Sequence, residues 1–163
     1  MSGFTEYQAS DASAASGRYD TVMTWATAQS MLPLVRRIVA DILEQANQLR
    51  KMHPEKDRLD RHRRDLAWPE RSRRYQLGEE IRNCEAKLQE ARAEMDTLGV
   101  AIIDVVMGQV GFPTLVNNRR AFFSWRPGEE EVDFWHYADS ESRRTVPLAW
   151  KESEAKHEPA RPK

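Results

Sequence analysis

Two long stripes of apolar residues, repeating at alternating spacings of three and four, constrain this chain more than any other feature. The first stripe consists of Val35, Ile38, Ile42, Gln45, Leu49 and Met52. The second consists of Leu77, Ile81, Cys84, Leu88, Ala91, Met95 and Leu98. Such spacing is typical of helices that coil against a partner helix. The two stripes predict a long antiparallel helical hairpin over about residues 34–98.

The ends of the helical part carry their own signals. Thr24 precedes WATAQSMLPLVRRIVADILEQANQL, and its hydroxyl can accept from the first unpaired helix amides. Pro33 lacks an amide hydrogen and crowds the preceding turn, so we expect a short helix followed by a long one. Gly99 follows the second stripe and supplies the helix stop.

The hairpin turn is placed by the lengths of the two arms. A turn at Pro69 gives matching arms of 32 and 29 residues, over residues 34–65 and 70–98, whereas a turn at Pro54 makes the second arm far too long. Pro54 then marks a kink or break in the first arm. Helix on both sides of Pro69 is supported by oppositely charged pairs at i,i+4 spacing, namely Asp57/Arg61, Asp60/Arg64 and Glu70/Arg74.

After Gly99 the apolar period changes to two. The short runs VAIIDVV, VGF, RRAFFSW and VDFWHY are separated by turn signals at Met107-Gly108, Asn117-Asn118 and Pro127-Gly128. These runs predict a small antiparallel β-meander of three or four strands over about residues 100–138. The fold class is therefore α+β, a long helical hairpin followed by a small sheet.

Composition sets the limits of the domain. The chain has 163 residues, 40% of them hydrophobic, which suits a single domain over residues 20–150. Residues 1–19 and 151–163 hold almost no large apolar side chains, so we expect disordered tails there. The net charge of −1, the lone cysteine and the lack of long apolar runs favour a cytosolic protein without a membrane segment.

Three segments together span nearly all of the predicted domain: MTWATAQSMLP, LGVAIID with GQVGFP, and FFSWRPGEEEVDFWHYAD followed by RR. The last is the most specific, with an apolar-Trp strand, a Gly-Glu turn and a strand ending in Trp-His, at Trp125, Gly128, Glu129, Trp135 and His136. They resemble the bacterial domain-of-unknown-function family 2203. The resemblance implies an α+β bacterial protein, cytosolic, without an established activity. The Arg-rich stretch over residues 55–75 looks like an extension of the compact family hairpin.

The predicted hairpin tip, residues 50–75, is strongly basic. It holds ten Lys and Arg against five acids, a local net charge of +5. Arg61, Arg64, Arg71, Arg73 and Arg74 are candidate anion ligands, because guanidinium groups engage phosphate oxygens in pairs. Trp68 and Tyr75 could stack on bases, so the tip is a candidate RNA-binding surface. The alternative is a solvated arm whose arginines pair with acids at i,i+4.

Aromatic residues predict a second surface on the sheet. If Phe123, Trp125, Val132 and Phe134 face the core, alternation sends Phe122, Trp135 and Tyr137 to the opposite face. Such a face would bind a ligand, form a homodimer contact, or be covered by Leu148 and Trp150 of the segment TVPLAW.

A third grouping consists of Glu129, Glu130, Glu131, His136, Arg143 and Arg144. Histidine beside carboxylates is the raw material of metal binding or acid-base catalysis. No HxxxH, HExxH or CxxC spacing occurs, however, and the parity of Val132 and Phe134 makes His136 a buried, hydrogen-bonded core ring.

Phosphate-binding glycine loops and the GxSxG elbow are absent from the sequence, and Cys84 lies on an apolar stripe where an inert thiol is expected. We therefore expect a non-catalytic interaction module, without cofactor or metal, that associates with itself through the sheet. Two alternatives stay open: a small metal- or ligand-dependent enzyme around His136, Glu129 and Arg143 or Arg144, and an RNA-binding hairpin tip.

Overall fold

The computed structural model describes residues 21–155 and begins with the predicted hairpin. Helix α2 (Trp25–Arg61) starts where expected, since the Thr24 hydroxyl accepts from the amide of Thr27 at 3.2 Å. The expected division at Pro33 is wrong, because α2 runs unbroken through both Pro33 and Pro54. Buried residues flank each proline, among them Leu32 and Val35 around Pro33. Their packing outweighs the loss of one backbone hydrogen bond.

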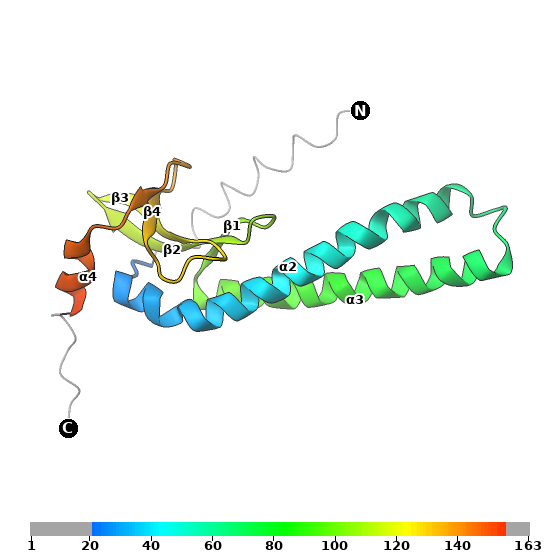
Figure 1. Cartoon of the computed structure of the whole chain (residues 1–163), viewed down its shortest axis with the longest axis horizontal. Helices are drawn as coiled ribbons and strands as arrows, with labels where there is room; N and C mark the ends of the chain where they lie inside the picture. Colours follow the sequence, from blue (N-terminus) through cyan, green and yellow to red (C-terminus); the bar gives the residue numbers. More distant parts are fainter. Residues whose placement is uncertain (1–20, 156–163) are drawn as a thin grey trace, which may run out of the picture.

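The predicted chain reversal next to Pro69 is confirmed. Helix α2 ends at Arg61, residues 62–67 form the turn, and α3 (Trp68–Leu98) carries Pro69 in its first turn. Gly99 ends α3 in the left-handed conformation, with φ of 73°. Every member of the second stripe is at least partly buried, from Leu77 to Leu98. Figure 1 shows the hairpin projecting as an arm well beyond the sheet.

The predicted meander is an antiparallel sheet of five strands in sequence order. Its strands are β1 (Ala101–Asp104), β2 (Gln109–Val116), β3 (Arg119–Trp125), β4 (Phe134–Tyr137) and β5 (Arg144–Thr145). Asn117 and Asn118 both have positive φ, 53° and 58°, as a tight β2–β3 hairpin turn requires. The sequence missed β5, which is only two residues long.

The main core lies between one face of the sheet and the hairpin base. On this core face Phe112 opposes Phe123, and Phe123 opposes Trp135. Side chains of α2 such as Val35 and Ile42 complete the same cluster. Farther out, a second and smaller cluster fills the seam between the two helices, with Leu49, Met52, Leu59, Leu77 and Ile81.

The C-terminal segment forms one more helix, α4 (Leu148–Ala155). Trp150 packs against Trp135, with ring centroids 5.4 Å apart, and Lys151 pairs with Asp133 at 2.7 Å. Residues 151–155 therefore differ from the expected disordered tail, because they continue helix α4, in which Trp150 and Lys151 make these contacts. The expected tail at residues 1–19 and the rest of the C-terminal one lie outside the described residues.

Candidate functional site

The ten basic residues of the hairpin tip (residues 50–75) divide into two sets. Three of them bridge to acids and are only partly exposed: Arg73 binds Glu55 through two hydrogen bonds of 2.9 and 3.1 Å, while Arg74 and Lys56 share Asp60. Of the three predicted i,i+4 pairs, none forms within the described residues. Because α2 and α3 lie side by side, Arg73 and Arg74 reach carboxylates across the seam instead.

These bridges shift the ionisation of their members. A hydrogen bond from Arg73 lowers the pKa of the Glu55 carboxyl below its usual range. Hydrogen bonds from Lys56 and then Arg74 lower the pKa of Asp60 in the same way. The bond to Glu55 raises the pKa of Arg73. The bridges thus hold the seam in its charged state at neutral pH.

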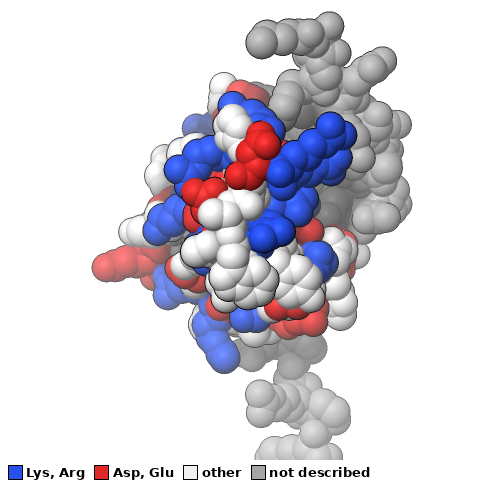
Figure 2. Space-filling model, turned by 90° about the vertical axis from the view of Figure 1, so that its right-hand side faces the viewer, with Lys and Arg blue, Asp and Glu red and all other residues white. Residues whose placement is uncertain are grey.

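The other seven basic residues of the tip are exposed and form no ion pair with the described part of the chain. They are Arg50, Lys51, Arg58, Arg61, Arg63, Arg64 and Arg71. Trp68 and Tyr75 are also exposed, to 72% and 68%. Figure 2 looks onto the tip and shows Lys and Arg side chains, interspersed with Asp and Glu, around an uncharged area. The predicted anion ligands Arg61, Arg64 and Arg71 are therefore available, whereas Arg73 and Arg74 are engaged.

A hollow of about 480 Å³ lies where the turn meets the two helices. Its apolar lining comes from Leu59, Leu66 and Pro69, and three of its other lining residues carry carboxylates. It is lined in full by Glu55, Arg58, Leu59, His62, Asp65, Leu66, Pro69, Glu70 and Arg73. The carboxylates make this hollow a poor site for a small anion.

On the sheet, the predicted exposed aromatic face is wrong. Phe122 opposes His136, whereas Trp135 opposes Phe123 and Tyr137 opposes Ala121 on the core face. The predicted alternation counts from Val132 as a core residue of the strand. Val132 is buried, but it lies before β4 and does not take part in the alternation of that strand. Trp135 and Tyr137 are buried, and Trp150 packs on Trp135. The expected cover of a second face by Leu148 and Trp150 is only partly met, because Trp135 lies on the core face and Leu148 is 68% exposed.

Two arginines lie over the Tyr137 and Trp135 rings. The guanidinium carbon of Arg119 lies 3.9 Å from the centre of the Tyr137 ring, and that of Arg144 lies 5.4 Å from the Trp135 ring centre. Arg144 is therefore separated from the predicted group around Glu129, and it caps the core instead.

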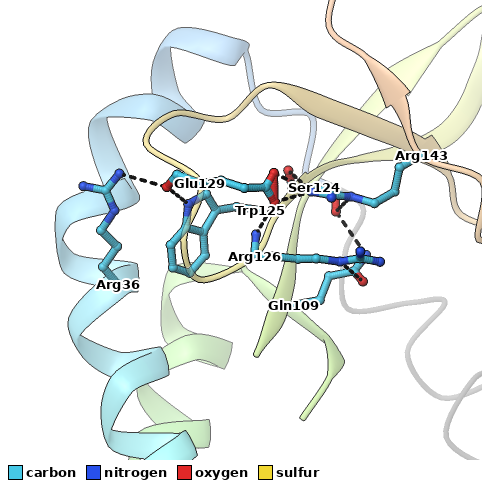
Figure 3. A network of polar contacts seen from close by, with 7 residues as sticks. All are labelled: Arg36, Gln109, Ser124, Trp125, Arg126, Glu129 and Arg143. Carbon is cyan, nitrogen blue, oxygen red and sulfur yellow. Dashed lines mark hydrogen bonds and ion pairs between the residues drawn. The ribbon is translucent and has the colours of Figure 1, made fainter. Parts of the chain in front are cut away.

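The opposite face of the sheet, which we call the second face, carries a polar network (Figure 3). Arg143 binds both carboxylate oxygens of Glu129, at 2.6 and 2.9 Å, and donates to the hydroxyl of Ser124 at 3.0 Å. The side-chain Nε2 of Gln109 donates to the same hydroxyl, and the Nε of Arg126 donates to the side-chain Oε1 of Gln109. The predicted neighbours Glu129 and Arg143 are thus brought together. Gln109, Ser124 and Arg126 were missed, because only the strand register reveals them.

The network also fixes the loop before β4. The Trp125 indole nitrogen donates to the Glu129 carbonyl at 2.9 Å, and Arg36 of α2 reaches the carbonyls of Glu129 and Glu130. The Arg143 guanidinium lies 4.3 Å from the Phe134 ring centre. With so many partners satisfied, this network is well suited to positioning the loop.

His136 is only 4% exposed on the second face, next to Phe122, with ring centroids 5.8 Å apart. Its Nδ1 lies 2.8 Å from the Tyr137 carbonyl oxygen. A carbonyl can only accept, so Nδ1 carries the hydrogen and Nε2 of a neutral ring is an acceptor. This Nε2 is the one buried side-chain nitrogen or oxygen of the described residues without a partner. The predicted buried ring is confirmed on the opposite face to the one expected, with half of its hydrogen bonding unmet.

Residues 21–155 contain no group of three or more His, Cys, Asp or Glu side chains that could hold a metal ion. Within the same residues no helix has the length and hydropathy needed to cross a bilayer. Cys84 is a free thiol, partly rather than fully buried, against the smaller cluster of the arm.

The fold and these surfaces define an α+β protein with a projecting helical arm. The family model described as "Uncharacterized conserved protein (DUF2203)" matches residues 21–146, so the chain belongs to this family of unknown function. No curated protein and no solved structure matches the chain.

Proposed function

We propose that this protein is a non-catalytic binding module whose hairpin tip binds RNA. The observation that carries the proposal is the division of the tip's basic residues into two sets: three bridge to acids, and seven are exposed and form no ion pair within residues 21–155. The bridges use Glu55 and Asp60, two of the five acids of the tip, so a clear excess of positive charge faces solvent.

The distribution of this charge favours a polymer over a small anion. The unpaired cations are spread from Arg50 near the middle of the arm, through the turn, to Arg71 in α3. Such a spread cannot converge on one phosphate, but it can follow a charged backbone. The nearby hollow adds carboxylates, which disfavour a small phosphate there. The body of the protein then serves to anchor and orient the arm.

A titration of labelled RNA at several salt concentrations tests the proposal. We expect binding that weakens steeply with salt, because each neutralised phosphate releases counterions. The triple variant Arg61→Glu, Arg64→Glu, Arg71→Glu should bind far less, with a log–log salt slope smaller by roughly two, at about 0.7 per single-strand phosphate.

The matched control makes the same charge change on exposed residues of α3 away from the tip, Arg82→Glu, Lys87→Glu and Arg92→Glu. The proposal predicts a much smaller loss of affinity for this control. Absence of RNA binding at low salt, or equal losses of affinity in both triple variants, would contradict the proposal. Either result would favour the alternative that the tip is a solvated arm.

A second candidate function is favoured by the unpartnered Nε2 of His136. A buried acceptor without a donor is unfavourable, so a small molecule that donates a hydrogen bond there would gain affinity. Phe122, whose ring centroid lies 5.8 Å from that of His136, would supply an apolar wall. This is the ligand-dependent alternative centred on His136, with an organic ligand favoured over a metal.

Native mass spectrometry of the full chain tests this candidate. A stoichiometric bound molecule that is lost in His136→Phe supports it, whereas a mass equal to the chain alone counts against it. The prediction of self-association through the sheet rests on exposed aromatic rings on one face. Trp135 and Tyr137, two of those rings, are instead buried in the core.

A further inference from the structure

The outer side of α3 at the tip carries a stripe whose chemistry is more specific than charge. Trp68, Arg71 and Tyr75 occupy positions i, i+3 and i+7, so they fall on one side of the helix. The buried residue Leu77 is nine positions after Trp68, half a turn away in angle, on the side that packs against α2. We call Trp68, Arg71 and Tyr75 the outer stripe.

Exposed aromatic rings at this position have no explanation in the packing of the protein. Trp68 and Tyr75 are the two aromatic residues among the large hydrophobic side chains that the described chain exposes. Solvent exposure of large rings is unfavourable, and their placement around an unpaired arginine adds no stabilising contact within the arm. The packing of α3 against α2 would be the same with polar residues on this side.

We propose that the outer stripe is a stacking platform for unpaired bases, and that the tip therefore selects single-stranded over double-stranded RNA. This inference rests on the proposed RNA-binding function and adds the form of RNA recognised. Seven residues of helix separate the rings by about 10 Å along the axis. Stacked bases of one strand lie only about 3.4 Å apart, so the two rings suit two bases that are not stacked on each other. Arg71 lies between the rings, where it can engage the intervening phosphate.

Base-paired RNA cannot use the stripe in this way. In a duplex both faces of each base are covered by neighbouring bases, and aromatic side chains reach bases mainly in single strands, loops and bulges. The exposed cations serve either form, because phosphates are present in both. Selectivity must therefore come from the rings.

The experiment compares an unstructured 20-nucleotide RNA, a 20-base-pair RNA duplex and inorganic polyphosphate at one low salt concentration. Three full-length proteins are used: wild type, the double variant Trp68→Leu with Tyr75→Leu, and the double variant Trp68→Phe with Tyr75→Phe. Both variants keep an apolar side chain, but only the phenylalanine variant keeps the rings. Circular dichroism checks that the helical content is unchanged.

We expect wild type to bind the single strand best. The leucine variant should lose about 5- to 100-fold in affinity for the single strand for each ring that stacks a base. The phenylalanine variant should retain most of this affinity. For the duplex, and likewise for polyphosphate, the three proteins should not differ in affinity. Equal binding of all three polymers, unchanged in the leucine variant, overturns the stacking inference but leaves the RNA-binding proposal. Absence of binding to any polymer overturns both.

Discussion

The body and the arm of this protein are built on the same two helices but are stabilised in different ways. At the body, α2 and α3 pack under a sheet, and twenty buried residues form one cluster. In the arm the helices have only each other, and five buried residues line a single seam, flanked by the bridges of Arg73 and Arg74. A helix pair without a third layer exposes most of its surface, so the arm depends on local contacts and leaves its outer residues available for binding.

The largest effect should come from the centre of the body. Phe112 is fully buried between the sheet and the helices, and Phe112→Ala should lower the free energy of unfolding by about 3–5 kcal/mol. Urea unfolding followed by tryptophan fluorescence measures this loss. Leu115→Ala, on the same strand but 46% exposed, is the control and should change it by less than about 0.5 kcal/mol. Equal effects of the two substitutions would contradict the place of Phe112 at the centre of the buried core of the body.

The seam of the arm should respond less, and locally. Leu77 is fully buried, and Leu77→Ala should cost about 2–3 kcal/mol, the lower end for such substitutions, since the thin seam can partly close. Hydrogen exchange should speed up around residues 49–81 while the sheet amides keep their protection. The exposed neighbour Gln76 offers the control Gln76→Ala. Faster exchange throughout the sheet would show that body and arm unfold as one unit.

The polar network at the edge of the body should show an intermediate effect. The Glu129 and Arg143 side chains are only 19% and 13% exposed, so Glu129→Gln should cost about 1–3 kcal/mol. Glu131 faces Lys151 at 3.7 Å with its side chain 54% exposed, and Glu131→Gln should cost less than about 0.5 kcal/mol. Urea unfolding compares the two variants. A smaller loss for Glu129→Gln than for Glu131→Gln would contradict the structural role of the network.

The smallest effect belongs to the bridges of the arm, which solvent screens. The pKa values of Glu55 and Asp60 are lowered in the folded arm, so these carboxylates stabilise it above their ordinary pKa of about 4 and lose this contribution as the pH falls through the lowered values. The variant Glu55→Gln with Asp60→Asn should therefore exchange arm amides slightly faster than wild type near neutral pH. The difference should vanish in strong acid and shrink in high salt. A difference that grows as the pH falls would have the wrong sign.

Local sequence features determined the elements of the fold. Alternating spacings of three and four placed both helices, Thr24 and Gly99 marked the outer ends of the hairpin, and matching arm lengths placed its turn next to Pro69. The paired asparagines marked the β2–β3 turn. These features act over a few residues and need no knowledge of what packs where.

The tertiary structure decided everything that depends on register and partner. Pro33 by itself predicts a break, but packing on both sides of it holds α2 together. Trp135 and His136 exchanged faces because the buried Val132 belongs to a loop and not to β4. The i,i+4 spacing predicts that acids of the tip pair with arginines four residues away, whereas α3 brings Arg73 and Arg74 to Glu55 and Asp60 across the seam. A sequence states which residues a chain has for pairing, but distances between distant segments select the pairs that form, and with them the arginines that stay available for a partner.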